Sequence, residues 1–179
     1  MIEKEKYLYW LNESESKFEQ DIVYREMYSR VGHIFHIFQM IEYNIANILA
    51  LEEFENESIK DFTEDDIERI RKNIDKKFEE LSKLTFGNLK RQVEKSDYLR
   101  EINLEKLKKI VDYRNYLSHR CFKEKLLNNQ LNIIEEIDKF VDELNEFETI
   151  VSDFNERLIM IFANKKIKRI WYKNNFTTR

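Results

Sequence analysis

Two residues with different chemistry, Arg114 and His119, lie five positions apart in the segment RNYLSH at residues 114–119. An arginine carries a fixed positive charge that pairs with a phosphate or a carboxylate, whereas an imidazole changes its charge near neutral pH. Asn115 directly follows the arginine and lies four residues before the histidine. A fixed cation, an amide and a titratable group at this spacing make the segment the strongest candidate for a functional site.

The spacing predicts how a helix would orient these side chains. At about 100° per residue, Asn115 and His119 lie on one flank of an apolar stripe, and Arg114 lies in the middle of that stripe. The stripe consists of Leu107, Ile110, Val111, Leu117 and Cys121. The cation is thus directed toward an interface, and its flexible side chain can lean toward the two polar residues.

A guanidinium at an interface needs a partner, because burying it alone costs several kcal/mol. One candidate partner is a substrate phosphate. The other is a carboxylate of the protein, for example Glu42 on the flank of the apolar stripe of the first long helix. In the second case Arg114 has a structural role, and His119 is an ordinary residue at the boundary of the core.

The bare pattern of an arginine followed by a histidine recurs at Arg30 and His36, so the spacing alone is not specific. Arg30 is followed by Val31 instead of a polar residue, and we interpret this second pattern as incidental. His33 and His36 could also bind a metal ion from adjacent turns of a helix, but no nearby cysteine or second histidine pair completes a site. We therefore expect no metal and no cofactor.

The elements that must position these residues are predicted to be helices. The chain has 179 residues, 42% of them hydrophobic, with no proline and two glycines, so it can form a core but has few residues that favour hairpins. Apolar residues recur at helical spacing in long segments separated by polar breaks. These features predict an all-α fold: a single-domain bundle of four to five helices at residues 1–163, followed by a short basic tail at residues 164–179.

Four long helices are predicted, at about Ser16 to Phe54, Thr63 to Leu84, Asn103 to Leu127 and Leu131 to Phe162. A shorter helix is predicted between the second and the third of these, and it ends at about Lys95. The stripe of the first helix consists of Ile34, Phe38, Ile41, Ile45 and Ile48. Thr63 and Asn103 are predicted N-caps, because their side chains can accept a hydrogen bond from the first turn of a helix. Residues 85–88 are predicted to form a turn, in which Gly87 can adopt a positive φ at no steric cost.

Charge is distributed unevenly along the chain. From Arg157 to Arg179 there are seven Lys and Arg and no Asp or Glu, which leaves a net charge of −11 on residues 1–156 against +7 on this end. The basic end also carries Trp171, Tyr172 and Phe176. It could hold a nucleic-acid backbone while its rings stack on bases. Alternatively, it ends a helix and folds back onto the core.

Cysteine usage and terminal composition bear on localisation. Cys121 is the single cysteine, so no intramolecular disulfide is expected, and the N-terminus lacks the apolar stretch of a secretory signal. We also expect no apolar run long enough to span a bilayer. The sequence therefore favours a cytoplasmic protein without a membrane partner.

The segment YRNYLSHR at residues 113–120 resembles the signature of HEPN domains, small helical domains named for higher eukaryotes and prokaryotes nucleotide binding. The family pattern is an arginine, four to six residues and a histidine in a late helix, often with a polar residue such as asparagine directly after the arginine. The segment LTFGNL at residues 84–89 also resembles a glycine-containing turn of some bacterial members. A bundle of four to five helices agrees with the family fold.

The resemblance implies a metal-independent endoribonuclease, in which a ribose 2′-hydroxyl attacks the adjacent phosphate and leaves 2′,3′-cyclic phosphate and 5′-hydroxyl ends. His119 would transfer protons, Arg114 would stabilise charge on the phosphate oxygens, and Asn115 would orient His119 or the RNA. Accessory residues would be Glu42, Ser118 and Arg120. The implied setting is toxin-antitoxin or antiviral defence, with an antitoxin protein as a further partner.

The resemblance also implies a homodimer. The reaction needs a proton acceptor and a proton donor, whereas one chain supplies one motif histidine. Motifs of two chains would line one cleft, and the apolar stripe around Arg114 would lie partly between subunits. In one toxin-antitoxin branch a tyrosine two residues after the histidine is modified by a partner enzyme, and Cys121 at this position argues against that regulation.

Two other classes of function stay open. One is a non-catalytic HEPN-like module that binds nucleotide, nucleic acid or a protein partner through the same surface. The other is a purely structural helical protein, which predicts that Arg114 is bonded to an internal carboxylate.

Overall fold

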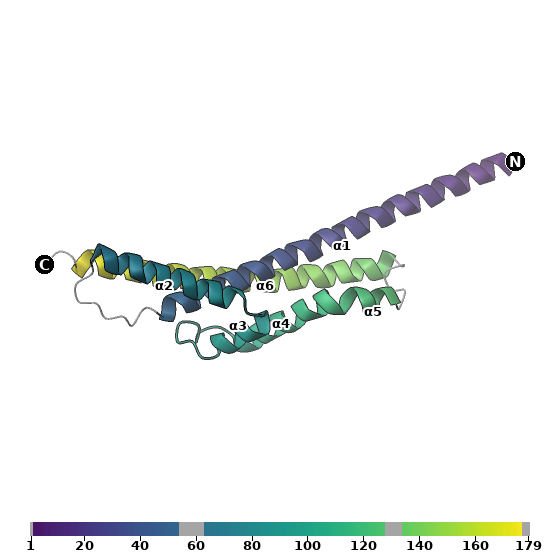
Figure 1. Cartoon of the computed structure of the whole chain (residues 1–179). Helices are drawn as coiled ribbons and strands as arrows, with labels where there is room; N and C mark the ends of the chain where they lie inside the picture. Colours follow the sequence, from purple (N-terminus) through teal and green to yellow (C-terminus); the bar gives the residue numbers. More distant parts are fainter. Residues whose placement is uncertain (1, 54–62, 128–133, 177–179) are drawn as a thin grey trace. The chain divides into compact units, whose positions relative to one another are not determined.

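The computed structural model of the chain describes residues 2–53, 63–127 and 134–176, with the side chains of residues 21–53, 63–125 and 135–165. The described residues form six helices and no strand (Figure 1). The helices are α1 (Ile2–Glu53), α2 (Glu64–Ser82), α3 (Phe86–Val93), α4 (Leu104–His119), α5 (Cys121–Leu127) and α6 (Ile134–Phe176). The predicted all-α class is confirmed.

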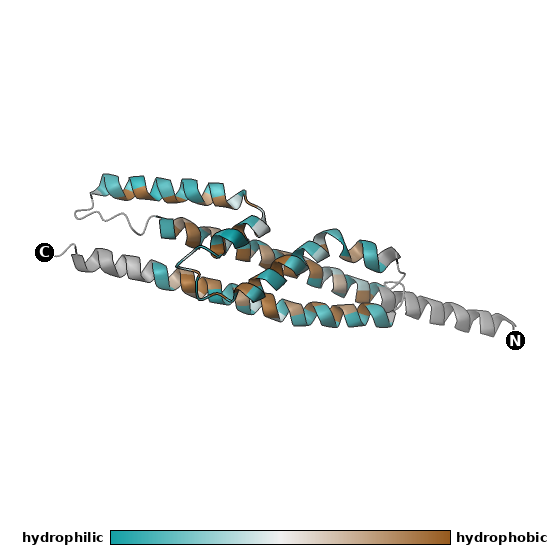
Figure 2. Ribbon diagram, turned by 90° about the horizontal axis from the view of Figure 1, so that it is seen from below, coloured by the Kyte–Doolittle hydropathy of each residue, from teal (hydrophilic) through white to brown (hydrophobic). Residues whose placement is uncertain are grey.

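The chain divides into two compact units, each made of segments that are distant in the sequence. Unit 1 consists of residues 1–36 and 115–150, and unit 2 consists of residues 37–114 and 151–179. Helices α1, α4 and α6 therefore each contribute residues to both units. Hydrophobic and hydrophilic residues alternate in bands along the helices (Figure 2), as expected of helices that bury one face.

The core of unit 1 combines residues of α1, the end of α4, α5 and the first half of α6. Its buried apolar side chains are Met27, Val31, Ile34, Leu117, Cys121, Ile137, Phe140, Val141 and Leu144. The Lys125 ammonium of α5 lies 4.2 Å from the centroid of the Phe140 ring on α6. This cation–π contact adds to the apolar packing that holds the chain just after the motif.

The core of unit 2 combines the second half of α1 with α2, α3, most of α4 and the second half of α6. Its largest fully buried side chains include Phe38, Ile41, Ile45, Ile48, Phe86, Leu89, Leu99, Leu107 and Ile110. Asn44 is also buried, and its Nδ2 donates a 2.9 Å hydrogen bond to Oδ1 of Asn155 on α6. A buried amide must be paired, so this bond fixes how α1 and α6 align within unit 2. The predicted stripe of the first helix is buried throughout.

Local capping explains where the shorter helices begin. Thr63 forms a capping box with Asp66, in which each side chain accepts a hydrogen bond from the backbone N–H of the other residue. Asn103 Oδ1 accepts from the N–H of Lys106 at 2.9 Å. Both predicted N-caps are confirmed. The prediction for Gly87 was wrong: Thr85 caps α3, and Gly87 lies in its first turn without a positive φ.

The helix ends differ from prediction mainly in length. α1 begins at Ile2 instead of Ser16, and α6 continues past Phe162 to Phe176, so that residues 164–176 of the predicted tail are helical. The helix predicted after Asn103 is divided at Arg120 into α4 and α5. Residues 128–133, which contain the predicted break and the predicted start at Leu131, and the side chains of Trp171, Tyr172 and Phe176 lie outside the described parts.

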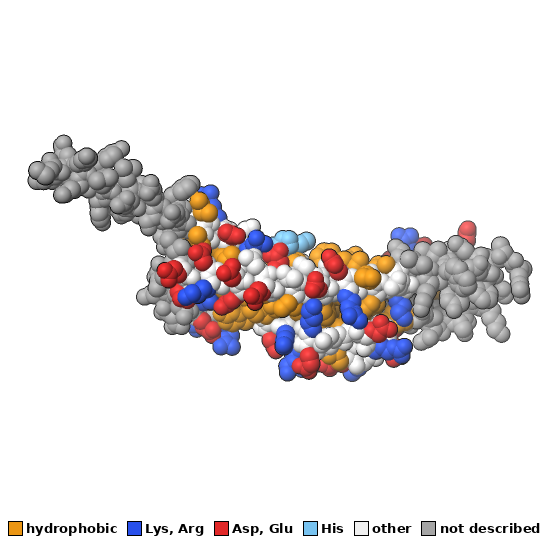
Figure 3. Space-filling view, turned by 180° about the vertical axis from the view of Figure 1, so that it is seen from behind, with side chains coloured by type: hydrophobic (Ala, Val, Ile, Leu, Met, Phe, Trp, Pro, Cys, Tyr) orange, Lys and Arg blue, Asp and Glu red, His pale blue; other side chains and the backbone are white. Residues whose placement is uncertain are grey.

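The surface carries charges of both signs. Figure 3 shows Lys and Arg side chains interspersed with Asp and Glu on one face, with hydrophobic side chains between them. The large exposed hydrophobic residues are Ile22, Tyr28, Tyr43, Ile67, Leu104, Ile150, Ile159 and Met160. No field of a single sign dominates the drawn face, so recognition there depends on local groups.

One described stretch, Asp21–Glu53 of α1, is long and apolar enough to cross a membrane by length and composition alone. The expectation that no run reaches this length was therefore wrong. Half of its apolar window is buried inside the protein, and a helix at the centre of a bundle passes the same test. The burial of the α1 stripe accounts for its composition.

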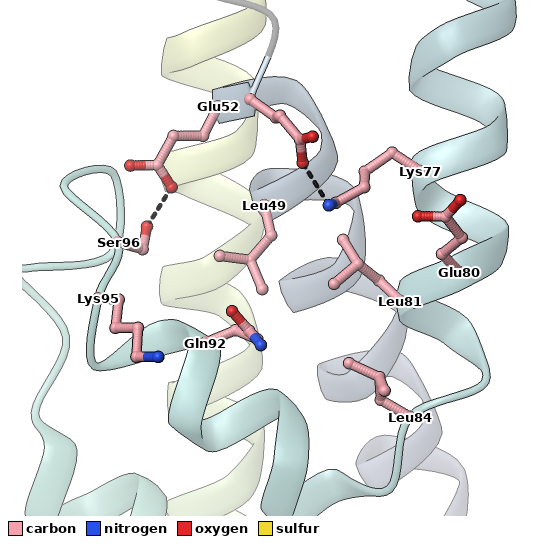
Figure 4. A pocket seen from close by; sticks show the side chains of 10 residues that line it. Leu49, Glu52, Lys77, Glu80, Leu81, Leu84, Gln92, Lys95 and Ser96 are labelled. Atoms are coloured by element: carbon pink, nitrogen blue, oxygen red, sulfur yellow. Dashed lines mark hydrogen bonds and ion pairs between the residues drawn. The ribbon is translucent and has the colours of Figure 1, made fainter.

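A single carboxylate, Glu52, organises the loop that leads into α4. Its Oε2 accepts a 2.5 Å hydrogen bond from the Ser96 hydroxyl (Figure 4), and its Oε1 accepts from the N–H groups of Asp97 at 2.7 Å and Tyr98 at 3.1 Å. The Ser96 hydroxyl in turn accepts from the N–H of Leu99, which is fully buried. Glu52 thus ties the end of α1 to the segment that sets the start of α4.

We expect Glu52→Ala to lower the free energy of unfolding by about 2–4 kcal/mol, because several backbone and hydroxyl donors lose a charged acceptor. Glu53→Ala is the matched control: Glu53 makes one ion pair with Lys77 on an exposed surface, and its loss should cost less than about 1 kcal/mol. Urea denaturation followed by circular dichroism measures both. Equal effects of the two substitutions would show that Glu52 does not organise the loop.

Candidate functional site

The RNYLSH motif lies on the last turns of α4 and spans the boundary between the units. Arg114 ends its segment of unit 2, and Asn115 begins its segment of unit 1. The neighbours of Arg114 are therefore described within unit 2, and the neighbours of the other motif residues within unit 1. Along α4 itself, helical geometry separates Arg114 from His119 by about 140° around the axis.

Asn115, Ser118 and His119 form an exposed polar stripe at the end of α4, here called the motif stripe. Residues three and four apart on a helix are neighbours, so the amide, the hydroxyl and the imidazole lie along one side of α4. The structure therefore brings together three of the predicted site residues. All three face solvent beside the buried Leu117.

The His119 imidazole is open to solvent. Within the described residues it makes no hydrogen bond and no ion pair. It lies in the last turn of α4, where the helix dipole favours a positive charge. No structural bond that folding requires occupies this ring, so it can exchange protons with solvent or with a bound molecule.

Arg114 is half-buried in unit 2 and lies beside Glu42 of α1. The Nη2 of Arg114 is 4.0 Å from Oε1 of Glu42, and the two side chains are 34% and 28% exposed. The internal carboxylate that the structural alternative required is therefore present, at the outer limit of an ion pair. Burial raises the pKa of Glu42 above its ordinary value, and the charge of Arg114 offsets this only in part. Burial outweighs the attraction, so the pair is a weak structural reason for the arginine.

The apolar stripe of α4 is buried within the single chain. Leu107, Ile110, Val111, Leu117 and Cys121 are at most 6% exposed. The predicted stripe is confirmed, but the expectation that it lies partly between subunits was wrong, because α1 and α6 residues of the same chain fill the two cores. A dimer contact must use other residues.

Two further residues of the motif region are held by neighbours. The Arg120 guanidinium pairs with Glu124 at 2.8 Å on an exposed surface. Cys121 is fully buried, and burial raises the pKa of its thiol, although a hydrogen bond with the Tyr116 hydroxyl lowers it in part. The thiol therefore stays protonated near neutral pH. Arg120 contributes charge near the motif stripe, whereas Cys121 is a core residue.

The second arginine–histidine pattern is part of an ion-pair cluster in unit 1. Glu148 of α6 binds Arg30 at 3.2 Å, and its other oxygen lies 3.8 Å from Nε2 of His33. Arg30 also lies 3.8 Å from Glu26, one helical turn earlier on α1. This arrangement gives Arg30 a structural partner. Among the described residues, no three His, Cys, Asp or Glu side chains are grouped so that they could hold a metal ion.

A groove of about 420 Å³ lies in unit 2, away from the motif residues. Leucines and charged residues line it together (Figure 4); the lining includes Leu49, Glu53, Lys77, Leu81 and Lys95. Glu53 and Lys77 pair across it. None of the predicted site residues lines this groove.

Sequence reasoning missed two arrangements in unit 1. One is the Glu148 cluster, which joins residues more than a hundred positions apart. The other is a row of aromatic rings formed by Tyr24, Tyr28 and Phe122. The four-residue spacing of the two tyrosines was a visible signal, but nothing in the sequence linked them to Phe122.

No protein-family model matches this chain, and comparisons with curated proteins and with solved structures likewise gave no match. Any assignment of function therefore depends on the motif residues and their geometry.

Glu42→Gln tests how strongly the fold needs the Arg114 pair. A carboxyl group whose pKa is raised on folding binds its proton more tightly in the folded state, so wild-type stability falls as pH rises through the unfolded and then the folded pKa. The glutamine variant lacks this loss. We expect it to gain stability relative to wild type between pH 4 and pH 7, measured by urea denaturation. Glu79→Gln, an exposed position on α2, is the control. If the wild type instead becomes more stable relative to the variant as the pH rises, the ionised Glu42 stabilises the fold, and Arg114 has a structural role as its partner.

Cys121 should react slowly with thiol reagents in the folded protein. The thiol is fully buried and its pKa is raised, and both effects reduce the exposed thiolate that reacts. The measurement is the rate of reaction with a chromogenic disulfide at pH 8, in buffer and in guanidinium chloride. Comparable rates in the two solutions would mean that the stripe opens readily in the native state.

Proposed function

We propose that this protein is an endoribonuclease of HEPN type, which cleaves RNA without a metal ion and acts in toxin-antitoxin or antiviral defence. The observation that carries the proposal is the exposed His119 imidazole, without a described structural partner, on one stripe with Asn115 and in one helix with Arg114. Among these residues, the fold gives the His119 ring no described structural bond. The resemblance of the segment to the HEPN signature supports the proposal.

His119 suits proton transfer because its ring is accessible and an imidazole can act as a general acid or base. In the proposed reaction a base takes the proton of the ribose 2′-hydroxyl, and the oxygen attacks the adjacent phosphorus. The bond from phosphorus to the 5′-oxygen breaks, and an acid protonates that oxygen. The products are a 2′,3′-cyclic phosphate and a 5′-hydroxyl, with no net consumption of protons.

Arg114 would stabilise the negative charge that grows on the phosphate oxygens. Its side chain is half-buried, which strengthens its interaction with an anion relative to a fully solvated cation. Glu42, which burial disfavours as a carboxylate, is a weak competitor for the guanidinium. Asn115 would orient His119 or the RNA from the same stripe, with Ser118 and Arg120 as accessory contacts to the substrate.

The proton count supports a homodimer. One motif offers one imidazole, and the reaction uses an acid and a base, so two motifs facing each other would provide both. Because the apolar stripe of α4 is buried within one chain, the subunits would associate through other exposed residues. RNA is the proposed substrate, and an antitoxin is the proposed inhibitory partner.

One observation favours a second candidate, a non-catalytic module that binds nucleotide, nucleic acid or protein. Arg114 has a carboxylate neighbour in its own unit, so its position does not require a substrate. In such a module the motif stripe would contact the ligand, and His119 would not act as an acid or a base. The two candidates differ in whether RNA is cut.

We expect purified wild type to cleave mixed single-stranded RNA in EDTA and to leave 2′,3′-cyclic phosphate ends. His119→Ala should reduce the rate at least about 100-fold, as loss of an acid–base group does. Arg114→Lys keeps the positive charge but loses the forked N–H donors of the guanidinium. It should reduce the rate at least about tenfold and leave the circular dichroism spectrum unchanged. His36→Ala, at another exposed histidine, should retain wild-type activity.

Three outcomes contradict the nuclease. Full activity of His119→Ala assigns the cutting to a contaminant or to another site. Inhibition by EDTA means that a metal ion takes part. RNA binding without cleavage by wild type favours the second candidate.

A further inference from the structure

Three aromatic side chains of unit 1 form a row of nearly parallel rings beside the motif stripe. The ring centroids of Tyr24 and Tyr28 on α1 are 6.4 Å apart with an interplanar angle of 21°. Tyr28 and Phe122 of α5 are 6.0 Å apart with an angle of 23°. Tyr24 and Tyr28 are four residues apart, so the repeat of the row matches the rise of about 6 Å over four helical residues. We call these three residues the aromatic row.

The middle ring of the row faces solvent. Tyr28 is 56% exposed, although large aromatic side chains usually bury most of their area. Core packing of unit 1 therefore does not explain this residue, since the α1 face that enters the core carries Met27, Val31 and Ile34 instead. The accessible part of the Tyr28 ring extends the row of aromatic surface that another flat ring could contact.

The row begins next to the motif histidine. Phe122 lies three residues after His119, and the helical hydrogen bonds continue across the break at Arg120: its N–H donates to the Tyr116 carbonyl at 2.9 Å, and its carbonyl accepts from Glu124 at 2.8 Å. Residues three apart on such a path are neighbours. The motif stripe and the aromatic row are thus continuous within unit 1.

Two exposed cations lie next to residues of the row in the sequence. Arg25 follows Tyr24 and Lys123 follows Phe122, and both are exposed and without an ion pair among the described residues. Two of the nearby acids have basic partners of their own, since Glu26 lies beside Arg30 and Glu124 binds Arg120. Rings with flanking cations can hold bases and phosphates together, as proteins that bind single strands do.

We propose that the aromatic row is a base-stacking platform that holds single-stranded RNA and directs its backbone toward His119. The inference rests on the proposed function for the identity of the strand as RNA. Unpaired bases stack on Tyr24, Tyr28 and Phe122, and Arg25 and Lys123 contact phosphates. Stacking on π-faces tolerates any base, so the platform recognises a single strand and not a sequence.

The row fits bases better than a protein partner. Protein interfaces concentrate their affinity in aromatic side chains that enter packed pockets. Here the rings form a near-parallel row, with Tyr24 and Tyr28 on α1 and Phe122 on α5, and more than half of the Tyr28 side chain is accessible. A second copy of the chain or another protein at this surface is the competing outcome of the test.

The test measures binding of a short fluorescent single-stranded RNA by anisotropy, in the full-length His119→Ala protein so that the RNA stays intact. Tyr28→Ala should weaken binding about tenfold or more, as the loss of one stacked base does. Tyr28→Trp keeps a stacking ring and should bind at least as tightly. Tyr43→Ala removes another exposed tyrosine, on unit 2, and should leave the affinity unchanged. An abasic oligonucleotide should bind weakly and respond little to Tyr28→Ala.

Several results would overturn the platform. They are equal affinity of Tyr28→Ala and its parent, no RNA binding by the parent, or a change in oligomeric state on Tyr28→Ala without a change in RNA affinity. The proposed nuclease is judged separately. If RNA binding depends on Tyr28 but the wild type does not cleave RNA, the platform is supported and the nuclease is rejected. If the wild type cleaves RNA and Tyr28→Ala does not change the cleavage, the nuclease is supported and the platform is rejected.

Discussion

Burial of the apolar stripe of α4 is the constraint from which the geometry of the motif follows. Leu107, Ile110 and Leu117 are almost completely buried, and each contributes roughly 1.5–3 kcal/mol relative to an exposed side chain. Turning the helix by one residue would move the stripe by about 100° and expose it. Because the stripe is buried, Asn115 and His119 lie on the side of α4 that faces solvent. The accessibility of the motif stripe is thus a consequence of packing, whereas the chemical identity of its residues is not.

The position of Arg114 depends on a balance between burial and attraction. A half-buried carboxylate beside a guanidinium would have a lowered pKa if the ion pair dominated, but burial dominates and the pKa of Glu42 is raised. A contact at 4.0 Å does not recover the hydration that both groups lose. In the proposed function, the ligand of Arg114 is an anion with several oxygens that can accept its forked N–H donors. A phosphate has this chemistry, and the proposed reaction provides one.

The sequence predicted what depends on local periodicity and capping. The α4 stripe, the α1 stripe and the caps at Thr63 and Asn103 follow from side chains within one or two turns, and all are confirmed. The turn predicted around Gly87 was wrong because Thr85 caps α3, so that the glycine lies inside the helix. Contacts between distant segments were out of reach: Glu52 binds residues 44 to 46 positions away, and Tyr28 stacks on Phe122. Of the site, the motif stripe could be predicted, but its aromatic neighbour could not.

Exposure also separates what the motif residues do for folding from what they do for function. Substitution of an exposed side chain without structural bonds changes stability by no more than about 0.5 kcal/mol. His119 belongs to this class, since its ring makes no described bond, whereas Arg114 is half-buried beside Glu42. A change of activity at His119 therefore reports chemistry directly, but a change at Arg114 combines chemistry with packing. The histidine, and not the more distinctive arginine, is the residue on which the functional assignment depends.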